Sequence, residues 1–123
     1  QDNSKMVLTI AVNYGGRWDM LQAAIKLTKA VQNDEINIDE INEESFSQFL
    51  SMEGVPHPDL LIRTGGEMRI SNFLLWQLAY SELYFTSTLW PDFDEASLNK
   101  AIENYYQRER RFGKTPKQIK ESK

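Results

Sequence analysis

A glycine turn between two apolar segments is the feature that most constrains the fold of this chain. Residues 60–62 form a short apolar run that is typical of a buried strand, and Gly65 and Gly66 supply a tight turn after it. A new apolar segment follows, and we predict a helix over residues 72–80 with Ser71 at its start. A strand, a glycine turn and a helix N-terminus in this order favour anion binding, because free backbone N–H groups point at the ligand.

Two arginines and a hydroxyl group surround this turn. Arg63 ends the predicted strand, and Arg69 and Ser71 follow the glycines. A charge at the end of a buried strand is costly without a partner, so we expect an anionic ligand there. A guanidinium group matches phosphate oxygens two at a time, which favours a phosphate. The alternative is an ordinary tight turn with solvated arginines, in which Ser71 is a plain helix cap.

The rest of the chain predicts alternating strands and helices. Residues 6–12 are an almost continuous aliphatic run, typical of a strand buried in a parallel sheet. A helix with Asp19 near its start and a second helix over residues 43–50 follow, then a short strand over residues 82–86 and a helix capped by Asp94. The apolar stripe of the first helix is predicted to be Trp18, Leu21, Ile25, Thr28 and Val31. This order favours an α/β fold with a mostly parallel sheet flanked by helices.

Composition excludes several classes of function. The net charge of −4, from 14 basic and 18 acidic residues, argues against general nucleic-acid binding. The chain has no cysteine, so it has no disulfide framework and no thiolate nucleophile or metal site. No apolar run approaches the roughly 20 residues that span a bilayer. We therefore expect a cytoplasmic globular segment, with peripheral contact to a membrane as an alternative.

Four blocks of sequence stand in a characteristic order. They are residues 13–19 (Asn-Tyr-Gly-Gly-Arg-Trp-Asp), residues 63–82 (beginning Arg-Thr-Gly-Gly-Glu), residues 89–93 (Leu-Trp-Pro-Asp-Phe) and residues 108–113 (Arg-Glu-Arg-Arg-Phe-Gly). Together they resemble the C-terminal half of the cis-prenyltransferase family, most closely the bacterial undecaprenyl diphosphate synthases. The resemblance implies that family's fold, a central, mostly parallel sheet surrounded by helices. It implies one partial domain over residues 1–113, and the composition of residues 114–123 predicts a charged, flexible tail.

The resemblance also implies a reaction and its substrates. In this family isopentenyl diphosphate condenses repeatedly with an allylic diphosphate, here farnesyl diphosphate, to give a long cis-polyprenyl diphosphate. Undecaprenyl diphosphate is delivered to the membrane as the lipid carrier of cell-wall peptidoglycan synthesis. The family pattern places the isopentenyl diphosphate on Arg63, Arg69, Ile70 and Ser71.

A metal and a second subunit are implied in the same way. The family pattern makes Glu82 a contact for Mg²⁺, which prefers hard oxygen ligands and often takes one or two carboxylates plus phosphate. The alternative is a strand-edge carboxylate paired with an arginine. Some relatives have a histidine at the position of Met68, and methionine is a poor ligand for Mg²⁺. In a homodimer, Arg111 and Gly113 would reach the neighbouring subunit's site.

One block of the family has no counterpart in these residues. It reads Asp-Gly-Asn-Gly-Arg-Trp and carries the catalytic aspartate, so the chain looks like the second half of a longer enzyme. We expect the chain alone to be inactive and to need the missing N-terminal half for its allylic diphosphate site. Two alternatives are a non-catalytic supporting subunit of a heteromeric cis-prenyltransferase and a generic phosphate-binding interaction module. The intact Arg-Thr-Gly-Gly-Glu block argues against the supporting subunit, which has little need of it.

Overall fold

The computed structural model describes residues 6–108, which fall into two compact units. The first unit contains the described part of Gln1–Val55 together with Asn72–Leu75, and the second contains Pro56–Ser71 with the described part of Trp76–Lys123. Within the described residues, no helix is long and apolar enough to cross a membrane.

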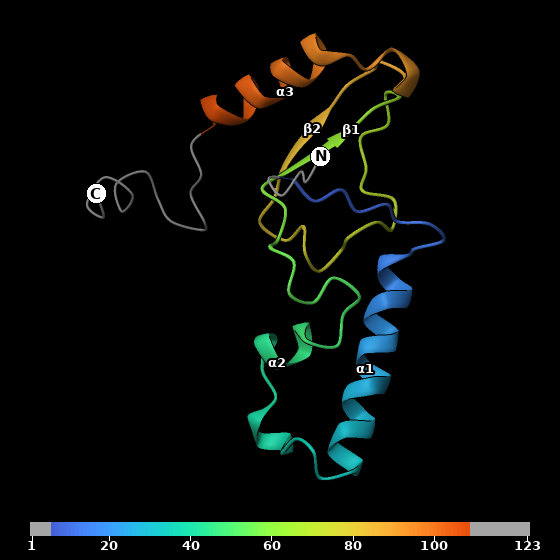
Figure 1. The fold of residues 1–123 in the computed structure, drawn as a ribbon, viewed down its shortest axis with the longest axis vertical. Helices are drawn as coiled ribbons and strands as arrows, with labels where there is room; N and C mark the ends of the chain where they lie inside the picture. The colour runs from blue at the N-terminus through green and yellow to red at the C-terminus, as the bar shows by residue number, and fades with distance from the viewer. Residues whose placement is uncertain (1–5, 109–123) are drawn as a thin grey trace, which may run out of the picture. The chain divides into compact units, whose positions relative to one another are not determined.

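The described part of the first unit contains two α-helices and a short 3-10 helix, which Figure 1 shows. Helix α1 spans Gly16–Gln32, η1 spans Ile38–Glu40 and α2 spans Glu43–Ser47. Helix α2 begins at a capping box, in which Asn42 Oδ1 accepts from Ser45 N at 2.9 Å and Ser45 Oγ accepts from Asn42 N at 2.9 Å. Both predicted helices of this unit are confirmed, although α2 ends earlier than expected.

Helix α1 buries a different face from the one that its apolar stripe predicts. Its buried residues are Gly16, Asp19, Ala23, Leu27 and Ala30. The predicted stripe is largely exposed, with Trp18 at 57%, Leu21 at 58% and Ile25 at 41% of full exposure. Three of the five buried residues are glycine or alanine, which lets neighbouring chain approach the helix closely. The large apolar side chains are thus left uncovered in the described part of the unit.

Asn72 caps helix α1 instead of beginning a helix of its own. Its carbonyl oxygen accepts from Gly16 N at 2.8 Å, and its Oδ1 accepts from Arg17 N at 2.8 Å. These are first-turn amides that have no partner within the helix. Ser71 and Asn72 have φ values of 53° and 59°, a left-handed conformation that a right-handed helix cannot contain. The predicted helix over residues 72–80 is therefore wrong, and these residues form turns.

The close approach at Gly16 gives a stability prediction. A Cβ atom at this position would lie 2.1 Å from the Phe73 carbonyl oxygen and 2.8 Å from Leu75 Cγ. We expect Gly16→Ala to lower the free energy of unfolding by about 1–3 kcal/mol, since the clash with backbone outweighs the gain in helix propensity. Urea denaturation followed by circular dichroism measures it. Gly54→Ala is the comparison, because a side chain there meets no atom within 4 Å and is opposed only by the φ of 74°. A Gly16→Ala variant as stable as the unmodified chain would contradict the clash.

The second unit is built on two parallel strands. Strand β1 spans Leu60–Arg63 and β2 spans Glu82–Phe85, with Leu60 opposite Glu82 and Arg63 opposite Phe85. The strands lie side by side in Figure 1, and the helix α3, Glu95–Gln107, contacts β2. A 3-10 helix, η2, occupies Trp90–Asp92. The parallel pairing confirms both predicted strands.

The cap of α3 is also confirmed. The Asp94 side chain accepts a hydrogen bond from Ser97 N at 2.9 Å, and this bond lowers the pKa of Asp94.

The strand predicted over residues 6–12 is absent from the described structure. Its apolar side chains are open to solvent, from 75% exposed at Ile10 to 90% at Val7. A strand needs partners for its backbone N–H and C=O groups, and the sheet in the described residues consists of β1 and β2 alone. The prediction rested on apolar composition alone. A strand over residues 6–12 would need a hydrogen-bonding partner other than the β1–β2 pair.

Candidate functional site

The glycine turn after β1 is held by its own backbone. Gly65 and Gly66 have φ values of 85° and 79°, which L side chains rarely adopt. Gly65 N donates to the Thr88 carbonyl at 2.9 Å, and Gly66 N donates to the Thr86 carbonyl at 2.9 Å. The prediction of a backbone anion cradle is wrong at these two glycines, because the residues after β2 use both amides. The predicted helix N-terminus is missing as well.

The side chains around the turn do come together. Arg63 Nη1 donates to Ser71 Oγ at 2.7 Å, and Arg69 Nε donates to the same oxygen at 3.0 Å. Arg63 Nη1 also donates to the carbonyl oxygen of Arg69. The structure thus joins the three polar residues that the sequence proposed as a phosphate site, and Ile70 is half-buried between two of them in the chain. We call Arg63, Glu67, Arg69 and Ser71 the arginine cluster.

Glu67 lies against both guanidinium groups of the arginine cluster. Its Oε2 is 3.5 Å from Arg63 Nη2 and also pairs with Arg69 Nη2. The side chains are partly open to solvent, with Arg63 at 25%, Glu67 at 44% and Arg69 at 68% exposure. Two positive charges and one negative charge leave the cluster net positive. It can bind an anion that reaches it from solvent.

Glu82, the predicted metal contact, is paired with an arginine. Its Oε2 accepts from Arg108 Nη1 at 2.8 Å, and Arg108 Nε donates to Asn104 Oδ1 at 3.0 Å. Among the described residues no group of three histidine, cysteine or acidic side chains could hold a metal ion. A single carboxylate fits Mg²⁺ only if phosphate oxygens and water complete the ligand set.

Glu82 and Arg63 do not share one site on the sheet. Glu82 is opposite Leu60, so it is three residues from Arg63 along the ladder, a backbone separation of about 10 Å. Successive side chains of a strand point to opposite faces, which puts Glu82 and Arg63 on different faces of the pair. A metal contact at Glu82 is thus a separate locus from the arginine cluster.

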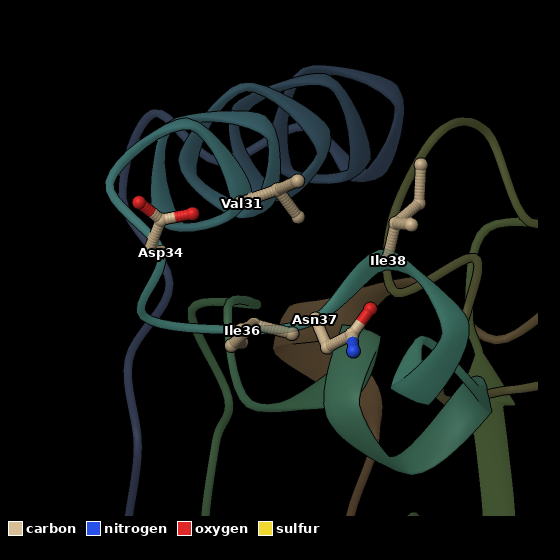
Figure 2. A pocket seen from close by; sticks show the side chains of 5 residues that line it. All are labelled: Val31, Asp34, Ile36, Asn37 and Ile38. Carbon is tan, nitrogen blue, oxygen red and sulfur yellow. The ribbon is translucent and has the colours of Figure 1, made fainter.

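A hollow in the first unit lies elsewhere. It has a volume of about 430 Å³ and lies between the end of α1 and the segment that follows (Figure 2). Its lining residues are Val31, Asp34, Ile36, Asn37 and Ile38. The only charge among these five is a carboxylate, so the hollow is unsuited to a diphosphate.

Asp19 is a buried residue whose role sequence reasoning missed. It is 2% exposed, and its carboxylate accepts from Tyr14 Oη at 2.8 Å, Ser51 N at 3.0 Å and Ser51 Oγ at 2.7 Å. The sequence suggested only a favourable charge near a helix start. The buried carboxylate instead ties the first turn of α1 to residue 51. An acidic residue in line with Ala23, Leu27 and Ala30 was the signal available.

The remaining predicted site residues, Arg111 and Gly113, lie outside the described residues. Comparison with known proteins then bears on the chain as a whole. A family model described as "Putative undecaprenyl diphosphate synthase" matches residues 1–113. The chain belongs to this prenyltransferase family. Its α/β class is the one that the family resemblance implied.

Individual members of the prenyltransferase family match closely. An isoprenyl transferase of Chromobacterium violaceum is 58% identical over 119 residues, covering 97% of this chain and 45% of the relative. A farnesyl-diphosphate-specific ditrans,polycis-undecaprenyl-diphosphate synthase of Legionella pneumophila (strain Paris) is 53% identical, covering 92% and 48%. Lavandulyl diphosphate synthase from Lavandula x intermedia, solved with dimethylallyl diphosphate, has a TM-score of 0.80 at 48% identity, covering 85% and 45%. The chain thus spans about half the length of the curated relatives it matches.

Proposed function

We propose that this chain provides the isopentenyl diphosphate site of an undecaprenyl diphosphate synthase. The observation that carries the proposal is the convergence of Arg63 and Arg69 on Ser71 Oγ beside the end of β1. Two guanidinium groups and a hydroxyl at one turn suit a diphosphate, which offers several acceptor oxygens and more than one negative charge. Family membership supports the same assignment.

In the proposed reaction the residues of the arginine cluster bind the substrate and do not take part in bond making or breaking. The C–O bond of the allylic diphosphate breaks, the isopentenyl double bond forms a new bond to the allylic carbon, and a proton is lost. The arginine cluster binds the diphosphate of the isopentenyl substrate, which does not leave in this step. It therefore fixes the position of the attacking double bond, a contribution from orientation. Repetition with farnesyl diphosphate as the first allylic substrate gives the long cis-polyprenyl diphosphate.

The allylic diphosphate site and the catalytic aspartate have no counterpart among these 123 residues. We propose that the part of the relatives' length that this chain does not cover supplies them, so the chain alone should not turn over substrate. A homodimer is part of the proposal, with Arg111 and Gly113 reaching the partner's site.

Mg²⁺ is also part of the proposal, with Glu82 as its one protein contact in the described residues. The metal would supply positive charge that stabilises the departing diphosphate. Arg108 pairs with Oε2 of Glu82, so a metal at this carboxylate would compete with Arg108 for its negative charge.

A chimera tests this function. The matching segment of the Chromobacterium violaceum relative is replaced by the 119 residues of this chain that align with it. We expect the chimera to incorporate radiolabelled isopentenyl diphosphate into polyprenyl diphosphate, and we expect the isolated chain to incorporate none. A folded chimera without activity would contradict the proposed site. Turnover by the isolated chain would show that the remaining length is not needed.

A further inference from the structure

Two guanidinium groups of the arginine cluster point at one carboxylate oxygen. Arg63 Nη2 lies 3.5 Å from Glu67 Oε2, and Arg69 Nη2 pairs with that same atom. A terminal phosphate oxygen that accepts hydrogen bonds from both arginines would take the same position. From this geometry we infer that Glu67 occupies the place of a substrate phosphate oxygen and must leave it when the diphosphate binds. The inference rests on the proposed function and makes the Glu67 carboxylate a competitor of the diphosphate for the two arginines.

The donors of the two arginines that are paired in the structure divide into two sets. Arg63 Nη1 serves Ser71 Oγ and the Arg69 carbonyl, and Arg69 Nε serves Ser71 Oγ, so these donors hold the turn in shape. The Nη2 groups are the ones directed at Glu67. A diphosphate can therefore bind both arginines through their Nη2 groups without disturbing the turn. Those are the donors that Glu67 holds.

The free energy of displacing the Glu67 carboxylate by a diphosphate should be favourable. The Glu67 side chain is 44% exposed, and a solvent-exposed ion pair contributes little to stability. A diphosphate brings more charge and more acceptor oxygens than a carboxylate, and contacts with charged groups are the stronger hydrogen bonds. If Glu67 stayed in place, its negative charge would repel the incoming anion. Removing the charge should thus strengthen binding, whereas a residue that only orients the arginines would weaken binding when removed.

Titration calorimetry with inorganic pyrophosphate, in buffer without divalent cations, tests the inference on the 123-residue chain. Glu67→Gln keeps the size and one acceptor oxygen of the side chain but removes its charge. We expect this variant to bind pyrophosphate about two- to tenfold more tightly than the unmodified chain, the scale of one exposed ion pair together with the lost repulsion. Glu103→Gln, at an exposed position of α3, is the control for net charge and should leave the affinity unchanged.

The possible outcomes separate this inference from the proposed function. Equal or weaker binding by Glu67→Gln, with the unmodified chain still binding, overturns the competitor and leaves the diphosphate site standing. Absence of binding in both proteins overturns the diphosphate site and the competitor with it. Equal tightening in Glu67→Gln and Glu103→Gln shows an effect of net charge and overturns the competitor. Circular dichroism of each variant confirms that the fold is retained.

Discussion

Arg63→Ala is expected to raise the KM for isopentenyl diphosphate about tenfold to hundredfold in the chimera. The guanidinium group makes a charge-assisted contact worth roughly 1.5–3 kcal/mol, and the substitution removes it. Arg63→Lys should recover only part of the loss, because an ammonium group cannot make the bidentate pair. The KM for the allylic substrate should change much less, since that diphosphate is assigned to other residues. Steady-state kinetics with each substrate varied in turn measures both values.

Arg69→Ala supplies the matched comparison for Arg63→Ala. Arg69 donates to the same Ser71 oxygen and pairs with the same Glu67 oxygen, so both arginines should serve one anion. The effects of the two substitutions should then be non-additive in the double variant. Single variants that lose thermal stability while the KM for isopentenyl diphosphate stays unchanged would make the arginines structural, and the site would have to be sought elsewhere.

Glu82→Gln is expected to lower the activity of the chimera by a factor on the order of 10² and to raise the Mg²⁺ concentration needed for half-maximal rate. The substitution keeps the shape of the side chain and removes the charge that a cation needs, and one well-placed electrostatic contact has this scale. Activity measured across a Mg²⁺ titration gives both quantities. The KM for isopentenyl diphosphate should move little, because Glu82 and Arg63 lie on different faces of the strand pair.

Arg108→Ala distinguishes a metal contact from a structural ion pair. Both Glu82→Gln and Arg108→Ala break the 2.8 Å ion pair between β2 and Arg108, the residue that follows α3. If Glu82 only anchors that residue, the two variants should behave alike and the Mg²⁺ titration should be unchanged in both. If Glu82 contacts Mg²⁺, the requirement should rise in Glu82→Gln alone. Removal of Arg108 frees the carboxylate and should, if anything, lower it.

Local features of this chain were predictable from sequence because their partners are close in the chain. The first three residues of β1 form one apolar run that begins two positions after Pro58, and Asp94 caps α3 through a residue three positions away. The convergence of Arg63, Arg69 and Ser71 was predictable for the same reason, since nine residues contain all three. The contact of Glu67 with both arginines could not be seen without side-chain positions.

Features that depend on distant residues were not predictable in this way. Asn72 caps a helix whose first residues lie more than fifty positions earlier, so a pattern that starts a helix locally was overridden. Helix α1 was predicted with the wrong buried face, because the stripe of large apolar residues does not show which face is packed. Residues 6–12 are apolar enough for a buried strand, but hydrogen-bonding partners decide whether a strand forms.

In the turn after β1, backbone amides maintain the shape of the turn and side chains carry its charges. The amides of Gly65 and Gly66 hold the backbone to Thr88 and Thr86, while the side chains of Arg63, Glu67 and Arg69 carry the charges and are partly open to solvent. In evolutionary terms the two tasks are therefore separable. A descendant could exchange the side chains at positions 63, 67 and 69 and acquire a different ligand preference, or lose binding, on an unchanged backbone. The same turn could thus persist in relatives that no longer bind a diphosphate, and the glycines alone would not diagnose the activity.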